Sequence, residues 1–337
     1  MFVNKLALLF FLSLINIHQP KKADDFNAFS HKFVTGYKAL HIPDLSLGYM
    51  QNIQSAKSLA DVNTQTDFFT TIQHDLAGFK PVQLSPNQKQ DYELIGYETG
   101  LNLERLKLEK EWLTSPNHKL TDEGLYKQEN GKLWYTYFLK KWLSANVTPD
   151  EVYQFGLKEV DRVKGHIEAV RKETGLSEDA FYKHLNDPSF FISDPKVVQQ
   201  SFVDLKKVIY ANMGNVFTVR DIPPLAIEKG TEANLAQTPG YYNNNTFYYN
   251  LFDKPYNKRQ VDWLFIHEAV PGHHYQSTLD NSSRTSEVQQ LFYYLGFAEG
   301  WGAYAEELGK QLGVYKTPYD ELGKWEWDIV RLIANQK

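Results

Sequence analysis

The segment His267-Glu268-Ala269-Val270-Pro271-Gly272-His273-His274 places three of the chain's ten histidines and one carboxylate within eight residues. Neutral imidazole is the commonest protein ligand for zinc, and metalloproteases place a general base directly after their first histidine ligand. The usual motif, HExxH, separates its histidines by one helical turn, so that both rings reach one ion. Here Pro271 occupies that position, and the next histidine comes six residues after the first.

This spacing predicts an interruption of the helix. On an unbroken helix, positions i and i+6 point about 120° apart, and i+7 lies about 10 Å further along the axis. Pro271 lacks the N–H that would bond to the carbonyl of His267, and Gly272 permits unusual dihedral angles. We therefore expect a bulge that brings His267 and His273 together on one metal. The alternative is a helix that ends at Pro-Gly, with a pair of surface histidines after it.

A second carboxylate lies in the next helical pattern. Ser286 and Gln289 form a capping box, which predicts a helix that begins there. An apolar stripe follows at helical spacing: Val288, Leu291, Phe292, Leu295, Ala298 and Gly302. Glu299 falls inside this stripe, where a carboxylate is costly unless it is paired or bound to a metal. Glu306 is its rival, and a buried glutamate paired with an arginine or tyrosine is the plainer alternative. Two histidines and one glutamate would leave one zinc position for water.

Two motifs carry a family resemblance. HEAVPGHHYQ, together with FAEGWGAYAEELG from Phe297 to Gly309, resembles the bacterial domain-of-unknown-function family 885. That family is similar in turn to the mostly helical zinc peptidases of the thimet oligopeptidase and carboxypeptidase Taq type. Their zinc motif ends in Phe-Gly-His, which aligns with Pro271-Gly272-His273 and implies His273, rather than His274, as the second ligand. The resemblance covers most of the chain after about Thr148 and implies C-terminal truncation, because the family continues beyond the equivalent of Trp325–Arg331.

The chain is expected to be mainly α, with a multi-helix zinc-peptidase-like fold and a small sheet or hairpin beside the metal-site helix. Ser85-Pro86, Thr148-Pro149 and Asp194-Pro195 are typical helix starts, and Lys132 to Ser144 is a further helix. We divide the chain into a targeting segment (1–22), an N-terminal helical region (23–147) and a zinc-hydrolase-like region (148–337).

A short β region is expected before the histidine-rich segment. Val216–Val219 and Thr246–Phe252 are rich in β-branched and aromatic residues. Asn243-Asn244-Asn245 predicts a tight turn that pairs Tyr241–Tyr242 with Phe247–Tyr249 as a hairpin. In the related peptidases the edge strand beside the metal binds the substrate backbone, which implies that Asn250 and the tyrosines line such an edge. The alternative is an ordinary hairpin that faces solvent.

Composition excludes several kinds of protein. The net charge is −5 with no basic block, so no nucleic-acid partner is indicated. The chain has no cysteine, which excludes disulfides, thiol catalysis and a lipoprotein anchor. Lys5 and the apolar run Leu6 to Ile15 are typical of a signal peptide, and the run is too short to span a bilayer. We therefore expect an exported protein, periplasmic or extracellular, with no membrane span after cleavage.

These features predict a zinc-dependent hydrolase, most simply a metallopeptidase that acts on a peptide or small amide. His267, His273 and Glu299 would hold Zn²⁺, and Glu268 would be the general base. Candidates to stabilise the oxyanion are His274 and three tyrosines: Tyr241, Tyr242 and Tyr304. The alternatives are a non-catalytic metal- or peptide-binding relative and a zinc hydrolase of non-peptide amides or esters.

Overall fold

The computed structural model of the protein describes residues 23–46, 48–116, 119–218, 221–252, 255–283 and 286–334. The chain divides into two compact units. The smaller unit comprises residues 1–119 and 286–291, and the larger unit comprises residues 120–285 and 292–337. The boundary expected after residue 147 falls inside the larger unit. The expected targeting segment, residues 1–22, lies outside the described residues.

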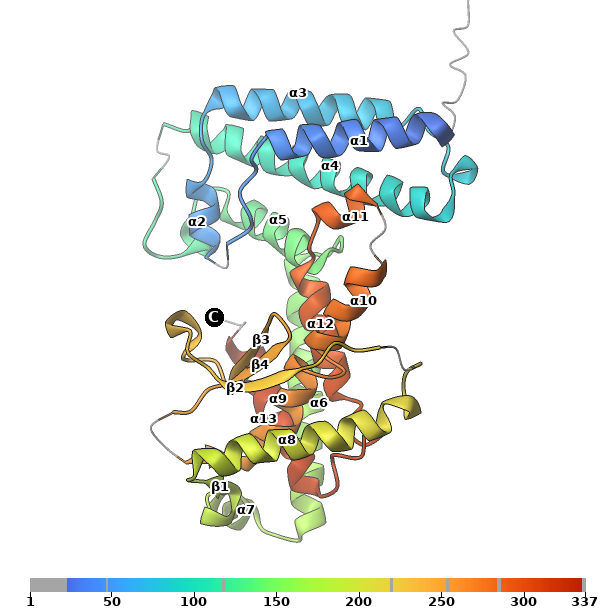
Figure 1. The fold of residues 1–337 in the computed structure, drawn as a ribbon. Coiled ribbons are helices and arrows are strands. Elements are labelled where there is room, and N and C mark those ends of the chain that lie inside the picture. The colour runs from blue at the N-terminus through green and yellow to red at the C-terminus, as the bar shows by residue number, and fades with distance from the viewer. Residues whose placement is uncertain are drawn as a thin grey trace, which may run out of the picture. The chain divides into compact units, whose positions relative to one another are not determined.

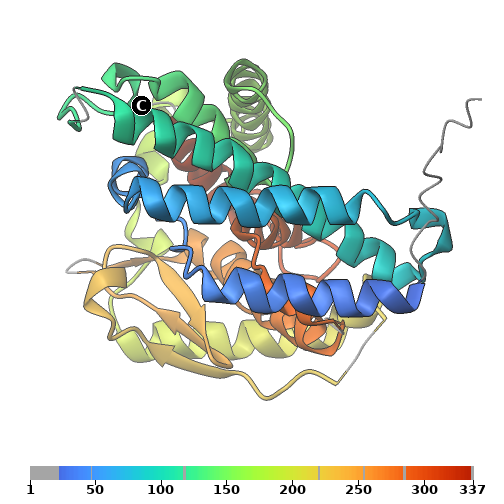
Figure 2. The ribbon, with the colours of Figure 1, turned by 90° about the horizontal axis from the view of Figure 1, so that it is seen from above.

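The smaller unit is helical. Its α-helices are α1 (Ala23–Ala39), α2 (Tyr49–Gln54), α3 (Leu59–Leu76), α4 (Pro86–Thr114) and α11 (Glu287–Leu291). Helices α1 and α3 lie side by side (Figures 1 and 2), and their Phe33 and Phe68 rings are stacked with centroids 6.3 Å apart. Helix α4 begins at the predicted cap, where Ser85 and Gln88 form a capping box. Aromatic contacts between helices thus stabilise this unit.

The larger unit is also mainly helical. Its α-helices are α5 (Gly131–Leu143), α6 (Pro149–Thr174), α7 (Glu178–His184), α8 (Pro195–Asn212), α9 (Val261–Glu268), α10 (His273–Ser283), α12 (Leu295–Glu306) and α13 (Pro318–Ala334). The predicted starts of α6 and α8 are confirmed, since Thr148 forms a capping box with Glu151 and Asp194 caps the backbone of Lys196. These caps are local interactions, which a short stretch of sequence is sufficient to specify.

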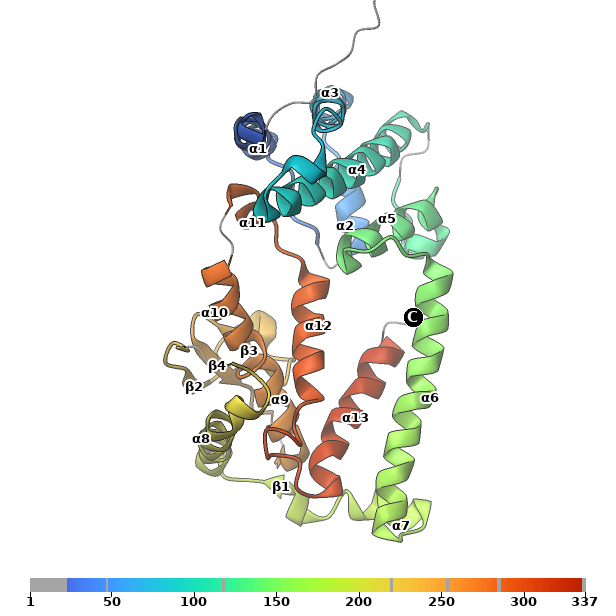
Figure 3. The same ribbon diagram turned by 90° about the vertical axis from the view of Figure 1, so that its right-hand side faces the viewer.

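Helix α9 runs through the hydrophobic core of the larger unit. Trp263, Phe265 and Ile266 are almost completely buried. Helices α8, α12 and α13 and strand β3 (Gly240–Asn243) pack around α9, and α13 also lies along α6 (Figure 3). Because α9 is apolar on every side, His267 in its last turn is carried into the core rather than to the surface.

Two small sheets complete the larger unit. One pairs β1 (Phe191–Ile192) with β5 (Tyr256–Asn257), and the other has the order β2-β4-β3, with β2 at Ala226–Lys229 and β4 at Thr246–Tyr249. The predicted hairpin is confirmed, because Tyr242 pairs with Phe247 and Tyr241 pairs with Tyr248. Asn244 and Asn245 both have positive φ angles, as a two-residue turn requires.

Three details of the β region differ from expectation. Strand β4 ends at Tyr249 and is central, because β2 pairs with it in parallel on its other side; the strand beside α9 is instead β3. Asn250 does not line an edge, since its side-chain amide donates to the carbonyls of Leu235 and Thr238. Val216 and Phe217 follow a 3-10 turn and form no strand, while Val219 lies outside the described residues.

The predicted helix from Ser286 to Gly302 is two helices rather than one. Ser286 does cap the backbone of Gln289 at the start of α11, as expected. The chain leaves the helical conformation at Phe292–Tyr294 before α12 begins. Helix α11 belongs to the smaller unit and α12 to the larger one, so packing in separate units outweighs the continuous apolar stripe.

The fold is therefore mainly α with small sheets, as predicted. Of the helices in the described part of the chain, none combines the length and the apolar character that crossing a membrane requires.

Candidate metal centre

The histidine-rich segment is two helices joined by a turn. Helix α9 ends at Glu268 and α10 begins at His273, so the interruption is larger than the single bulge that the sequence predicted. The N–H of His274 donates to the carbonyl of Ala269, five residues earlier, at 3.0 Å. A Cβ on Gly272 would lie 1.8 Å from the carbonyl oxygen of His267, so this close approach requires glycine. The turn carries His273 back toward His267.

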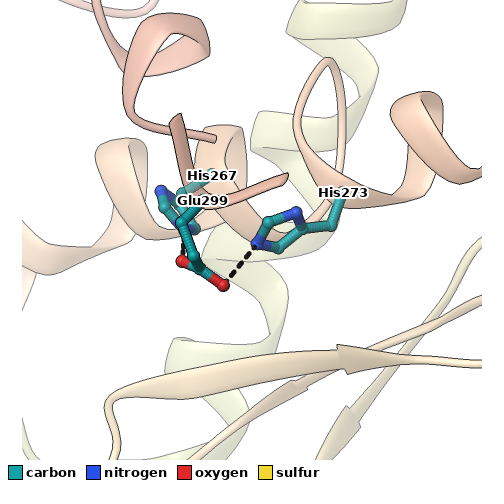
Figure 4. A group of neighbouring side chains, drawn as sticks. All are labelled: His267, His273 and Glu299. Atoms are coloured by element: carbon teal, nitrogen blue, oxygen red, sulfur yellow. Dashed lines mark ion pairs between the residues drawn. The ribbon is translucent and has the colours of Figure 1, made fainter. Parts of the chain in front are cut away.

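The two rings and one carboxylate converge as predicted. The ring centroids of His267 and His273 lie 4.9 Å apart (Figure 4). The Nε2 atom of His267 is 3.4 Å from Glu299 Oε2, and the Nε2 atom of His273 is 3.8 Å from Glu299 Oε1. Ligands of a tetrahedral zinc ion, with bonds of about 2.0–2.1 Å, lie about 3.3 Å apart. One nitrogen of each ring and one carboxylate oxygen all lie within 4.8 Å of one another, so this donor set fits a zinc ion.

Glu299 is not buried, contrary to expectation, although its carboxylate does lie beside both histidines. The Glu299 side chain is 57% exposed, while Glu306, seven residues later on α12, is completely buried. Glu306 Oε1 lies 2.7 Å from His267 Nδ1 and accepts a hydrogen bond from Arg331 Nη1 at 2.9 Å. The pairing expected of a buried glutamate thus belongs to Glu306, on the far side of the His267 ring from Glu299.

Glu268 lies beside the two histidines. Its side chain is 16% exposed, and its Oε2 atom is 4.0 Å from His273 Nε2. Burial is the main influence that raises the pKa of Glu268 to about 7; the charge of His267 opposes this rise, and Glu299 adds to it. The nearby backbone N–H of Tyr242, on β3, also favours the ionised carboxylate and so opposes the rise in this pKa. A carboxyl group with a pKa near neutrality is suited to transfer a proton.

The charges around His267 favour a cation. Burial, the strongest influence, would lower the pKa of His267, but hydrogen bonds with Glu299 and Glu306 outweigh it and raise this pKa to about 9. The hydrogen bond with His267 holds the pKa of Glu299 below its ordinary value. Burial lowers the pKa of His273. One positive charge, either a proton or a metal ion, is therefore stabilised between these carboxylates.

The residues predicted to stabilise the oxyanion do not lie with the triad formed by His267, His273 and Glu299. His274 is completely buried, and its Nδ1 and Nε2 atoms lie 3.2 Å from Tyr242 Oη and 2.9 Å from the carbonyl oxygen of Pro223. Tyr242 Oη also contacts Asn245 in the hairpin turn. This arrangement favours a structural role for both side chains and excludes the pair of surface histidines that was the alternative.

The other two candidate tyrosines, Tyr241 and Tyr304, also make contacts that are typical of a structural role. Tyr241 Oη accepts hydrogen bonds from the backbone N–H groups of Thr231 and Glu232, at 3.4 Å each. Tyr304 is 53% exposed and packs against Trp301, with ring centroids 6.0 Å apart. Neither contact directs a hydroxyl to the triad.

Several residues at the site were not predicted. Gln276 Oε1 lies 3.3 Å from His273 Nδ1, Trp301 Nε1 donates to the carbonyl of Pro271 at 2.8 Å, and Arg331 contacts Glu306. Glu306 had been named only as a rival ligand. The Gln276 contact follows helical spacing and could have been found, because it lies one turn after His273. Arg331 comes from a helix distant in sequence, and no local signal identifies it.

Comparison with known proteins supports the resemblance to one family. The family model described as "Bacterial protein of unknown function (DUF885)" matches residues 108–334, which include the triad, Glu268 and Glu306. The match begins well upstream of Thr148, where the resemblance was expected to start. No curated protein and no solved structure matches the chain. Because the matched region covers more than half of the 337 residues, the chain belongs to the bacterial family DUF885.

Proposed function

We propose that this protein is a zinc-dependent hydrolase, most simply a metallopeptidase with a helical zinc-peptidase-like fold. The observation that carries the proposal is the convergence of two imidazole nitrogens and one carboxylate oxygen within 4.8 Å, with Glu268 beside them. Three protein ligands leave one zinc position for water, which is typical of catalytic rather than structural sites. A protein that only stores metal needs no buried carboxyl group next to its ligands, so Glu268 favours an enzyme over a binding protein.

The residues divide the work of hydrolysis between them. His267, His273 and Glu299 would hold a zinc ion, which supplies Lewis acidity and lowers the pKa of a bound water. Glu268 is the general base: it accepts a proton from the attacking water and delivers it to the leaving group. The backbone N–H of Tyr242, on β3, lies near the Glu268 carboxylate and favours its ionised form.

The position of β3 supports a peptide substrate. Among the described strands, β3 pairs only with β4, so its other edge lies at the margin of the sheet. Asn243 and Thr246 close the two-residue turn as a hydrogen-bonded pair, so the alternating ladder directs the backbone groups of Tyr242 outward. The Tyr242 N–H lies near Glu268, so this edge is close to the proposed general base. An extended peptide that pairs with β3 would carry its backbone past the site.

Metal analysis and one substitution test the proposal. Protein purified without chelator should contain one zinc per chain and should hydrolyse members of a panel of peptides. Glu268→Gln should keep full zinc content and lose nearly all turnover, because the amide cannot accept the proton. A protein that binds zinc but cleaves nothing in peptide, amide and ester panels is a binding protein. Cleavage of esters alone would indicate a non-peptide hydrolase, and absence of zinc binding would refute the metal site.

We also propose that the protein is exported, on the basis of the apolar run Leu6 to Ile15 after Lys5. N-terminal sequencing of the protein recovered from fractionated bacterial cells tests this directly. Cleavage near residue 22 in the periplasmic or secreted fraction is the expected result, and an intact Met1 in the cytoplasmic fraction would contradict it.

A further inference from the structure

The Glu306 carboxylate is completely buried between a ring nitrogen and a guanidinium group. Its Oε1 atom is 2.7 Å from His267 Nδ1 and 2.9 Å from Arg331 Nη1. We propose that Glu306 is the positioning residue of this site: it holds the proton of His267 on Nδ1 and so directs the Nε2 lone pair to the metal. The inference rests on the proposed zinc site and assigns a role to a residue outside the ligand set.

The tautomer of His267 decides whether it can bind zinc. A neutral imidazole carries one N–H, and the nitrogen that binds a metal must offer a lone pair. Since Nε2 faces Glu299 and the metal position, the proton must lie on Nδ1. A carboxylate at hydrogen-bond distance from Nδ1 accepts that proton's bond and stabilises this tautomer. Carboxylates that contact the second nitrogen of a metal-bound histidine commonly raise metal affinity in this way.

Arg331 could compete with Glu306 as the hydrogen-bond partner of His267 Nδ1. Its Nη2 atom lies 3.4 Å from His267 Nδ1, but a guanidinium group can only donate. A bond from Arg331 to the ring would need a lone pair on Nδ1 and would place the proton on Nε2, where it blocks the metal. The contact from His267 Nδ1 to Glu306 is shorter, at 2.7 Å, and Arg331 Nη1 donates to Glu306 itself. Arg331 therefore serves to hold Glu306 rather than the ring.

The same guanidinium group balances the buried charge. An unpaired carboxylate in a protein interior is strongly destabilising. Arg331 Nη1 also lies 3.1 Å from Asp328 Oδ1, so α13 supplies both the cation and its second partner. Helix α13 packs against α9, which carries His267. The orientation of one metal ligand on α9 thus depends on a carboxylate from α12 and an arginine from α13.

Glu299 and Glu306 bracket the His267 ring from one helix. They lie seven residues apart on α12, which is about two turns. Glu299 contacts Nε2 at 3.4 Å, and Glu306 contacts Nδ1 on the opposite edge of the ring. Glu306 is not in the group of side chains that could share one ion. This geometry makes Glu299 a ligand and Glu306 a residue that acts through His267.

His273 provides an internal comparison. Its Nδ1 atom lies 3.3 Å from Gln276 Oε1, which is a longer contact with a neutral acceptor. Charge-assisted hydrogen bonds are shorter and roughly twice as strong as neutral ones. Loss of Gln276 should therefore weaken zinc binding less than loss of Glu306.

Zinc affinity of four variants tests the proposal. Glu306→Gln keeps an acceptor without charge, Glu306→Ala removes it, and Gln276→Ala removes the neutral acceptor. Glu307→Gln is the control, because Glu307 is the adjacent carboxylate, 44% exposed, and pairs with Lys324. Competition with a chromophoric chelator measures the zinc dissociation constant. We expect it to rise about 10-fold in Glu306→Gln and about 100-fold in Glu306→Ala, less than 10-fold in Gln276→Ala, and not at all in Glu307→Gln.

Two further readouts separate positioning from other roles. The ¹⁵N signal of His267 Nδ1 in the zinc-loaded protein should shift in Glu306→Gln, which a purely structural carboxylate would not require. Zinc stoichiometry at saturation should remain one per chain in Glu306→Ala, whereas complete loss would make Glu306 a ligand and overturn the inference. Glu306→Gln is nearly isosteric, so it decides the question if Glu306→Ala does not fold. Wild-type protein without zinc binding overturns the proposed function; zinc-binding wild type with Glu306 variants within about twofold of it overturns this inference alone.

Discussion

Gly302 lies against the ring of His267, so closely that a Cβ on this glycine would be 2.6 Å from the ring's Cε1 atom and 2.8 Å from both nitrogens. Glycine at this position of α12 lets the helix backbone approach the imidazole directly. The close approach brings Glu299, on the preceding turn, within 3.4 Å of Nε2. The site thus depends on a residue that contributes no functional group.

The first prediction concerns this contact. Gly302→Ala should displace the His267 ring and raise the zinc dissociation constant at least about 10-fold, as loss of an outer-shell partner does. Gly300→Ala is the matched control, because nothing lies within 4 Å of its Cβ position on the same helix. The control should bind zinc normally and be about 0.5–1 kcal/mol more stable, since alanine favours helix. Chelator competition and urea denaturation measure both effects, and equal zinc affinities would show that the ring is not held against α12.

The second prediction separates the adjacent histidines. His273→Ala should weaken zinc binding by more than the roughly 10–100-fold typical of a lost outer-shell partner, with little change in stability. His274→Ala should retain zinc but lose about 2–4 kcal/mol of unfolding free energy, because the buried ring contacts Tyr242 and the Pro223 carbonyl. Metal content and denaturation of both variants are the measurements. The opposite pattern, with zinc lost only in His274→Ala, would show that His274 rather than His273 is the ligand.

The third prediction concerns the turn between α9 and α10. Trp301 Nε1 donates to the Pro271 carbonyl at 2.8 Å and ties this turn to α12. Trp301→Phe keeps an aromatic ring but removes the donor, so it should cost about 1 kcal/mol of stability and weaken zinc binding several-fold. Trp327→Phe is a comparison in the same unit, because Trp327 stacks on Trp263 rather than on the turn. If both variants bind zinc as tightly as the wild type, the hydrogen bond does not position His273.

Features specified by nearby residues could be predicted from the sequence. The caps at Ser85, Thr148 and Asp194 and the turn at Asn244-Asn245 each depend on a few consecutive side chains. The convergence of His267 and His273 followed from Pro271-Gly272, because this pair interrupts the helix at the required place.

Features that depend on distant partners could not be predicted. Strand β2 pairs in parallel with β4, but its residues do not alternate between buried and exposed positions. A pattern of alternating apolar residues therefore could not identify it. Arg331 reaches Glu306 only because α13 packs against the core helix α9. The stripe that suggested one helix from Ser286 to Gly302 gave no sign that its two halves pack in different units.

The last prediction concerns pH and stability. Asp262, in the first turn of α9, is largely buried, and this burial together with the nearby Asp320 carboxylate raises its pKa from 3.8 to about 7. Between about pH 4 and pH 7, Asp262 is therefore protonated in the folded protein but ionised in the unfolded chain. Stability must fall as the pH rises through this window, by at most about 4 kcal/mol for this group. Above about pH 7 the group contributes no further change.

Asp262→Asn isolates this effect, since an amide has the shape of the protonated carboxyl group and does not titrate. The unfolding free energy of the variant relative to the wild type should increase steadily from pH 4 to pH 7 and then level off. Asp179→Asn is the control, because Asp179 is exposed in the first turn of α7. Urea denaturation at several pH values, on protein treated with chelator, gives the difference directly and removes the metal from the comparison. A constant difference across this range would mean that Asp262 is ionised in the folded protein, with Lys316 as the available cation.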